Sequence, residues 1–227
     1  MPLEPHEPYE MSRMIHRLRT NVRRFGKLRA SLGGSASRWL QYRLGLRPAD
    51  TQTTAEEQAC LMKYGAGKRS LVEIGVMHGV NTALLRSVMD PSGTITGIDP
   101  HPPGRLGVSF ERWIALREVA KYPRGRVVLL RTWSYEAARS WSAPIDFLFI
   151  DGDHSWAGIE RDWRGWRRYV VPGGTVALHD SRSVPERPDL DSVRYTRGVI
   201  LADPGFRLMH AVESLTALEC LPDENYR

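Results

Sequence analysis

The sequence is poor in the features that identify several large classes of protein. Its 227 residues include only two cysteines, Cys60 and Cys220, which lie far apart. We interpret them as two reduced, partly buried thiols rather than as a disulfide or as metal ligands. No apolar run approaches the roughly 18 residues that a membrane-spanning helix needs. The first residues also lack the basic-then-apolar order of a secretory signal. We therefore expect a cytoplasmic protein.

Acidic residues are absent from one long segment, and this absence locates the net charge of +6. Between Met11 and Ala49 there are ten lysines and arginines and no acid. With the three acids of residues 1–10, residues 1–49 carry a net charge of +7. The chain from Asp50 onward is therefore slightly acidic, with a net charge of −1. No aromatic stacking platform interleaves the basic residues. Nucleic acid is therefore not expected as a partner.

The basic segment has the pattern of an N-terminal helical arm, which we assign to residues 1–50. Its apolar residues form one stripe of an amphipathic helix, and Gly33 and Gly34 interrupt the pattern before a second helical piece around Trp39 to Leu44. Three roles stay open: a lid over the active site, a contact with a second copy of the chain, or binding to an anionic membrane surface. The lid and the homodimer contact are favoured over the membrane.

The rest of the chain, residues 51–227, alternates apolar strand patterns with helical patterns. A helix is expected to begin with a capping box from Thr53 to Glu56. Five strands are expected at residues 71–74, 94–99, 127–130, 145–150 and 175–178. Alternation of this kind predicts an α/β fold with a parallel sheet and helices on both faces. Two further strands, 206–212 and 214–221, are separated only by Glu213, and so tight a link predicts an antiparallel C-terminal hairpin.

Polar residues mark the ends of four of these strands: Glu73, Asp99, Asp151, and the pair His179 and Asp180. In open α/β sheets this is the edge at which ligands bind. The first strand is followed by a glycine turn at Gly75 and Gly79, which lets a ligand approach the backbone closely. The three fixed glycines of a dinucleotide fingerprint are absent, and Glu73 is poorly placed beside a pyrophosphate. A ligand with a cationic end fits this edge better.

With these motifs the chain resembles the class I S-adenosylmethionine-dependent methyltransferases over about residues 53–221. Such a resemblance implies a Rossmann-like, seven-stranded, mostly parallel sheet closed by the C-terminal hairpin. Within the class, the chain is similar to a bacterial O-methyltransferase family that includes the macrocin-type and other macrolide-sugar methyltransferases and the cephalosporin hydroxylase-like proteins. More distantly it is similar to the catechol methyltransferases. The resemblance rests on Glu73–Gly79, Asp99, Ile150–Trp156, Val171–Gly174 and Leu178–Asp180.

The resemblance implies that the cofactor is S-adenosylmethionine, and it distributes the parts of that molecule along the strand ends. Gly75 and Gly79 would admit its amino-acid part, and Glu73 would attract the amino group directly or through water. Asp99 would accept both ribose hydroxyls. The remaining residues expected in the cofactor site are Met77 and Asn81 near the methionine and ribose, Trp133 and Ser134 near the adenine, and Asp151.

The resemblance also implies the catalytic groups. His154 stands where relatives place the general base, and Asp151 and Asp180 offer oxygen ligands that suit Mg²⁺. Several relatives have two adjacent acids where this chain has His179 and Asp180. Imidazole is a poorer ligand for Mg²⁺, so a weak, different or absent metal stays open.

These residues imply an O-methyltransferase that acts on a hydroxyl of a small molecule, most plausibly a sugar or a glycosylated natural product. The alternative is a member of the family that does not methylate, either a hydroxylase-like protein or a module that only binds the cofactor. A nicotinamide oxidoreductase is disfavoured because the glycine turn does not match its fingerprint.

Overall fold

The computed structural model describes residues 34–104, 107–185 and 189–222. Contacts within the chain divide it into two compact units, Met1–Pro48 and Ala49–Arg227. In the first unit the described helix is α2, Ser35–Arg43, which confirms the second helical piece expected near Trp39. The apolar stripe expected from Met11 to Leu32 lies outside the described residues. No helix in the described part of the chain combines the length and the apolar character needed to cross a bilayer.

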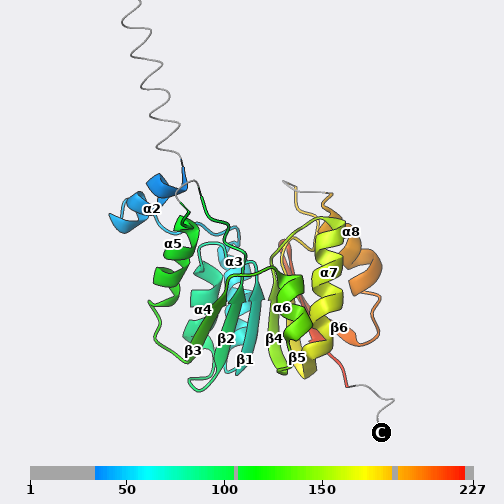
Figure 1. Ribbon diagram of the computed structural model, residues 1–227. Helices are drawn as coiled ribbons and strands as arrows, with labels where there is room; N and C mark the ends of the chain where they lie inside the picture. The colour runs from blue at the N-terminus through cyan, green and yellow to red at the C-terminus, as the bar shows by residue number, and fades with distance from the viewer. Residues whose placement is uncertain (1–33, 105–106, 186–188, 223–227) are drawn as a thin grey trace, which may run out of the picture. The chain divides into compact units, whose positions relative to one another are not determined.

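The second unit is built on the seven-stranded sheet that the sequence predicts (Figure 1). Its spatial order is β3-β2-β1-β4-β5-β7-β6. The strands β1 to β5 pair in parallel, whereas β7 is antiparallel to both β5 and β6. The seven strands are β1 (Ser70–Ile74), β2 (Thr94–Ile98), β3 (Arg126–Leu130), β4 (Ile145–Ile150), β5 (Val170–Leu178), β6 (Phe206–Val212) and β7 (Leu215–Cys220).

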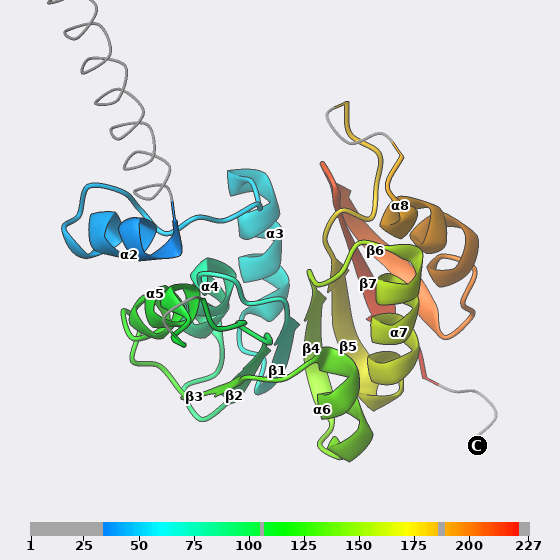
Figure 2. The same cartoon turned by 45° about the horizontal axis from the view of Figure 1, so that its top comes forward.

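Helices cover both faces of this sheet. Figures 1 and 2 show α3, α4 and α5 on one face and α6, α7 and α8 on the other. A 3₁₀ turn extends α7, and a π-helical segment, Thr196–Ile200, extends α8. The helices are α3 (Ala55–Gly65), α4 (Val80–Val88), α5 (Phe110–Val119), α6 (Ser134–Ser140), α7 (Trp156–Trp166) and α8 (Asp191–Tyr195).

The central strand β4 shows why the strands read as continuous apolar runs. Phe147 and Phe149 pack in the core beneath α3 and α4, whereas Leu148 and Ile150 pack in the core beneath α6 and α7. Successive strand residues point to opposite faces, so a strand with helices on both sides needs apolar residues throughout. Trp163 and Trp166 of α7 are buried in the second of these cores, where they contribute packing.

The register of the sheet aligns the strand ends that carry the polar residues. Ile74 pairs with Ile98 on one side and with Ile150 on the other, and Ile150 pairs with Leu178. The residues that follow these four positions therefore emerge side by side at one edge. They are Gly75, Asp99, Asp151 and His179.

The helix α3 begins one residue later than expected, so the capping box predicted from Thr53 to Glu56 is wrong. Glu57 Oε2 accepts from the backbone N–H of Thr54 at 3.0 Å, and Thr54 Oγ1 accepts from that of Glu57 at 3.3 Å. Thr53 instead donates to Asn81 Oδ1 at 2.8 Å. Tandem threonines and tandem glutamates make both registers compatible with the sequence pattern. The observed register is the one that buries Glu57 against Ser214, whose N–H lies 3.0 Å from Glu57 Oε1.

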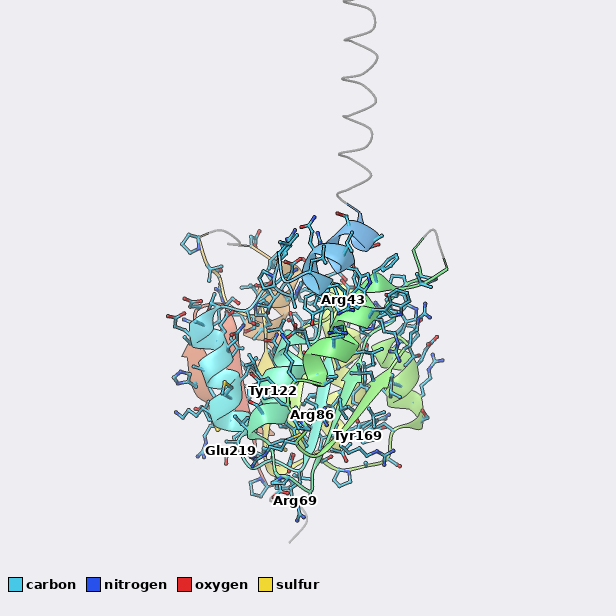
Figure 3. The ribbon with its side chains drawn as sticks, turned by 90° about the vertical axis from the view of Figure 1, so that its left-hand side faces the viewer. Arg43, Arg69, Arg86, Tyr122, Tyr169 and Glu219 are labelled. Carbon is cyan, nitrogen blue, oxygen red and sulfur yellow. The ribbon has the colours of Figure 1, made fainter. Side chains whose placement is uncertain are left out.

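An arginine fixes the helix that follows the glycine turn. Arg86 of α4, labelled in Figure 3, donates to the carbonyl oxygens of Val119, Arg124 and Gly125 at 2.6, 2.9 and 3.1 Å. These carbonyls belong to the end of α5 and the connection into β3. The arginine therefore ties the last turn of α4 to α5 and to the start of β3.

Candidate functional site

A cavity of about 380 Å³ opens at the carboxyl ends of β1, β2 and β4. This volume lies within the range of small-molecule sites. Most of the residues predicted for the site line it, whereas Glu73, Gly79 and Asp180 are not among its lining residues. The predicted residues that line it are Gly75, Met77, Asn81, Asp99, Trp133, Ser134, Asp151 and His154.

The turn after β1 presents bare backbone to this cavity. Gly75 has a φ of +90°, and a Cβ there would lie 2.0 Å from the carbonyl oxygen of Asp151. No side chain fits at this position, so the turn rests directly on the end of β4. Gly79 caps α4 with a φ of +75°, and a Cβ there would lie 3.0 Å from Ala115 Cα. Gly79 therefore serves the close contact of α4 with α5, and its predicted role toward the cofactor stays a prediction.

Asp99 cross-links the ends of β1 and β2. Its Oδ2 accepts from the backbone N–H groups of Val76 and Met77 at 3.0 and 2.8 Å. Its Oδ1 accepts from the N–H of His101 at 2.7 Å, and the His101 ring lies 2.8 Å from the carbonyl oxygen of Met77 through Nε2. A carboxylate has about four acceptor positions and three are used here, so Asp99 keeps about one for a hydroxyl donor in the cavity.

Glu73 lies beneath the cavity rather than in its wall. The side chain is fully buried, Thr82 donates to its Oε2, and its Oε1 has no hydrogen-bond partner among the described residues. Burial raises the pKa of this carboxyl well above its usual range, against the Thr82 hydrogen bond, which lowers it. Contact of Glu73 with the cofactor amino group remains a prediction.

The opposite end of the cavity contains an acid that sequence reasoning missed. Asp162 of α7 accepts a hydrogen bond from Ser134 Oγ and is itself buried. Burial raises its pKa to about 6, although the Ser134 hydrogen bond lowers it. Trp133, which precedes Ser134, leaves about half of its surface exposed. One feature of the sequence could have indicated Asp162. It is an acid that falls on the apolar face of α7, together with Ile159, Trp163 and Trp166.

The predicted base and acids do come together at the ends of β4 and β5. His154 Nε2 lies 3.8 Å from Asp151 Oδ1 and 3.6 Å from Asp180 Oδ2. The His154 side chain is 29% exposed, whereas that of Asp180 is 2% exposed. The carbonyl oxygen of His154 accepts from the N–H of Ser192 at 3.1 Å, so α8 fixes the loop that carries it. His154 is thus the accessible member of this group.

Behind this group lies a buried ion cluster in which His179 faces three acids, Asp151, Glu57 and, at 3.9 Å from Nδ1, Asp180. His179 Nδ1 lies 2.9 Å from Asp151 Oδ1, and its Nε2 lies 3.4 Å from Glu57 Oε2. Burial lowers the pKa of His179, but the contacts with Asp151 and Glu57 outweigh it and raise the value to about 10. For Glu57 burial acts in the opposite direction and raises the pKa, but the hydrogen bonds with His179 and Ser214 bring it down to about 2. Glu57 was missed because its sequence context indicates only a helix cap.

The donor set at this edge does not fit Mg²⁺. Asp151, His154 and His179 bring one ligand-type atom each within 4.8 Å of one another, and two of these atoms are imidazole nitrogens. Mg²⁺ takes oxygen ligands in near-octahedral geometry. The expected oxygens of Asp151 and Asp180 thus share this edge with two imidazoles, one of which, His179, already contacts Asp151.

Comparisons with known proteins agree with this architecture. Residues 72–181 match a family model described as a methyltransferase domain. The chain is similar to a solved protein of Corynebacterium glutamicum, at a TM-score of 0.61 and 16% identity over 88% of this chain and 98% of that one. It is also similar to the O-methyltransferase TomG of Streptomyces achromogenes, solved with SAM. The TM-score is 0.56 and the identity 18%, over 83% of this chain and 90% of TomG. A third similar structure is an O-methyltransferase of Bacillus cereus, solved with SAH. The TM-score is 0.52 and the identity 17%, over 82% of this chain and 90% of that one.

A curated relative from Rhodospirillum rubrum, described as an uncharacterized transcriptional regulator in the ATPase CF(0) region, is 33% identical over 72 residues. The match covers 30% of this chain and 61% of that protein, so the chain spans about three fifths of the length of this relative. The structural likenesses all lie below 25% identity and show the fold. Residues 72–181 thus match a methyltransferase domain, and the strand order with its closing hairpin gives the second unit the Rossmann-like fold expected from the resemblance.

Proposed function

We propose that this protein transfers a methyl group from S-adenosylmethionine to a hydroxyl of a small molecule, with His154 as the general base. The observation that carries the proposal is the position of His154. It is a partly exposed imidazole that lines the cavity and lies between Asp151 and Asp180, at 3.8 and 3.6 Å. A sugar or a glycosylated natural product is the proposed class of acceptor.

The cavity has the features that the cofactor needs. Bound S-adenosylmethionine would supply an electrophilic methyl group on its sulfonium. Gly75 and Asp99 both line the cavity, so we assign the amino-acid part to the turn at Gly75 and a ribose hydroxyl to the remaining acceptor position of Asp99. At the other end, Asp162 and Ser134 lie beside exposed Trp133, so we assign the adenine to them, with Asp162 accepting from its amino group.

His154 and the two acids have separate tasks in this proposal. Methyl transfer to oxygen requires an acceptor held in line and a base that takes the hydroxyl proton. His154 takes that proton on Nε2, the nitrogen nearest to both acids. The negative charges of Asp151 and Asp180, 3.8 and 3.6 Å from that nitrogen, then stabilise the resulting imidazolium. No step requires an ion at this edge.

The named structural neighbours support oxygen as the atom that is methylated. TomG is described as an O-methyltransferase involved in tomaymycin synthesis, and the Bacillus cereus neighbour is also described as an O-methyltransferase. Both descriptions belong to those proteins. The imidazole between two carboxylates is the feature of this chain that suits deprotonation of a hydroxyl.

Calorimetry with S-adenosylmethionine and S-adenosylhomocysteine tests the proposal first, and a panel of hydroxylated acceptors tests it second. Binding of both ligands, followed by release of S-adenosylhomocysteine with a sugar-containing acceptor, is the expected result. Absence of binding would remove the proposal. Binding without turnover on any hydroxylated acceptor would favour the non-methylating alternative.

For the basic arm, residues 1–50, we keep two proposed roles, a lid and a contact with a second copy of the chain. Light scattering of the full chain separates them. A dimer that dissociates at high salt would support the contact, since exposed charges are screened by salt. A monomer at all salt concentrations would support the lid.

A further inference from the structure

We infer that His179 takes the place of a divalent cation at this edge, by donating hydrogen bonds to Asp151 and Glu57, and that the site works without a bound metal. The inference deepens the proposed function and rests on it for its catalytic meaning. It concerns a residue that lies outside the cavity lining and was considered in the sequence only as a weak metal ligand.

Three elements converge on the His179 ring. His179 follows β5, Asp151 follows β4, and Glu57 lies in the first turn of α3. Both ring nitrogens are engaged, Nδ1 with Asp151 Oδ1 at 2.9 Å and Nε2 with Glu57 Oε2 at 3.4 Å. The ring is 1% exposed, so these contacts lie away from bulk solvent. Two carboxylates can both accept from one ring only when both of its nitrogens carry protons.

The balance of charge leads to the same arrangement. Glu57 is buried, and Asp151 lies in the cavity wall with its side chain 14% exposed. Neither acid has a lysine or arginine partner among the described residues. Burying a carboxylate without a counter-charge is strongly unfavourable, even where it accepts hydrogen bonds as Glu57 does from Thr54 and Ser214, so a positive charge is needed between them. A doubly protonated His179 supplies it, because its Nδ1 faces Asp151 and its Nε2 faces Glu57.

This arrangement gives His179 a positioning role. It does not touch the cavity, but it holds Asp151 Oδ1 at 2.9 Å, and the same oxygen lies 3.8 Å from His154 Nε2. The same ring also lies close to Asp180, whose Oδ2 is 3.9 Å from Nδ1 of His179. In a metal-dependent site this positioning falls to the ion and its ligands.

A competing arrangement would use the same residues as ligands of a transition metal. Asp151, His154 and His179 would then bind the ion, and Glu57 would be the outer hydrogen-bond partner of a metal-bound histidine. The two arrangements differ at one atom. In ours Nδ1 of His179 carries a proton, whereas in the competing one it binds the ion.

The first experiment measures metal directly on the full chain. The metal content is determined on the protein as purified, and after EDTA treatment and desalting Mn²⁺ is titrated by electron paramagnetic resonance as a probe for an oxygen-rich site. We expect no stoichiometric metal in the wild type and no saturable Mn²⁺ binding, with S-adenosylhomocysteine affinity unchanged by EDTA. A tightly held ion whose affinity falls about 10–100-fold in Glu57→Gln would overturn the inference, because that is the effect of removing an outer partner of a metal ligand.

A gain-of-binding variant is the matched arm of this experiment. His179→Glu restores the two adjacent acids present in several relatives, and we expect it to bind Mn²⁺ where the wild type does not. A folded His179→Glu protein that binds no Mn²⁺ would contradict the inference, since the position would then not be a cation site at all. Folding is checked by its melting transition and by retained binding of S-adenosylhomocysteine.

A second measurement needs no variant and no cofactor. Long-range ¹H–¹⁵N spectra of the histidine rings report which nitrogens carry protons. We expect His179 to show two protonated ring nitrogens that are unaffected by excess Mg²⁺, Mn²⁺ or Zn²⁺. One unprotonated nitrogen on His179 that responds to added metal would overturn the inference. These measurements do not involve S-adenosylmethionine. Failure of cofactor binding would therefore refute the proposed function without affecting the result for His179.

Discussion

The carboxylate of Asp99 accepts a hydrogen bond from the backbone N–H of Met77 at 2.8 Å, so the acid that ends β2 also holds the turn that follows β1. Met77 has a φ of 48°, a left-handed conformation that is unfavourable for a residue with a side chain. Asp99 therefore has two tasks, supporting this turn and offering an acceptor to the cavity.

Substitution of Asp99 should affect the two tasks differently. Asp99→Ala removes the acceptor of three backbone N–H groups, so we expect a loss of stability and a loss of cofactor affinity of about 1–3 kcal/mol. Asp99→Asn keeps one acceptor oxygen and should recover part of the stability but less of the affinity. Calorimetry with S-adenosylhomocysteine and urea unfolding measure the two effects. Unchanged affinity in Asp99→Ala would contradict the ribose assignment.

Removal of the His154 imidazole should separate turnover from binding. His154→Ala is expected to abolish methyl transfer, because no other imidazole is exposed between Asp151 and Asp180, while S-adenosylhomocysteine affinity stays within a few-fold of wild type. The matched control is His210→Ala, an exposed histidine of β6 outside the cavity lining. Retained turnover in His154→Ala would remove this residue from the base role.

The bare backbone at Gly75 should tolerate no side chain. Gly75→Ala places a methyl group 2.0 Å from the carbonyl oxygen of Asp151 in a left-handed conformation, and we expect a loss of several kcal/mol or failure to fold. Gly173→Ala has the same sign of φ with no atom within 4 Å of the added Cβ, so it isolates the backbone strain at about 1–2 kcal/mol. Urea unfolding compares the two, and equal losses would mean that the close approach to β4 is unimportant.

Asp162 should make stability depend on pH in one direction. Its folded-state pKa of about 6 lies above the ordinary 3.8 because burial outweighs the Ser134 hydrogen bond. The folded state therefore binds the proton more tightly, and stability falls as pH rises from about 4 to about 6. Asp162→Asn removes this loss, so we expect it to be more stable than wild type by about 1–3 kcal/mol at pH 7 and equal to it near pH 4.

The same substitution tests the adenine assignment. Asparagine keeps an oxygen for Ser134 but carries no charge, so the affinity for S-adenosylhomocysteine should fall even as the protein becomes more stable. Arg161 and Asp153 also act on Asp162, and both are retained in the comparison. A difference in stability between variant and wild type that does not change between pH 4 and pH 7 would argue against a raised pKa.

Much of the fold could be predicted because local patterns and tertiary needs agree. Apolar stretches that end in an acid mark the parallel strands, and the single-residue link at Glu213 leaves only an antiparallel hairpin. Pairing in register makes the parallel strands end at the same edge of the sheet. For this reason Asp99 and Asp151 meet at one edge, as expected. The family resemblance then assigned roles to residues that the sheet brings together.

The parts that could not be predicted depend on contacts between distant segments. Asp162 approaches Ser134 only because α6 and α7 pack side by side, which no local pattern of either helix indicates. The capping register of α3 was ambiguous between two threonines, and burial of Glu57 against Ser214 decided it. Neither the pairing of Glu57 with His179 nor the position of Glu73 beneath the cavity has a signature in spacing.

The hydrogen bonds from Ser214 to Glu57 join positions 157 residues apart. During synthesis Glu57 leaves the ribosome long before the final hairpin, and His179 also precedes it. A nascent chain that stops short of residue 214 therefore lacks one of the supports that hold Glu57 against His179. The acidic edge can take its described form only when nearly the whole chain has been made, so truncated products should be inactive even where the first five strands have formed.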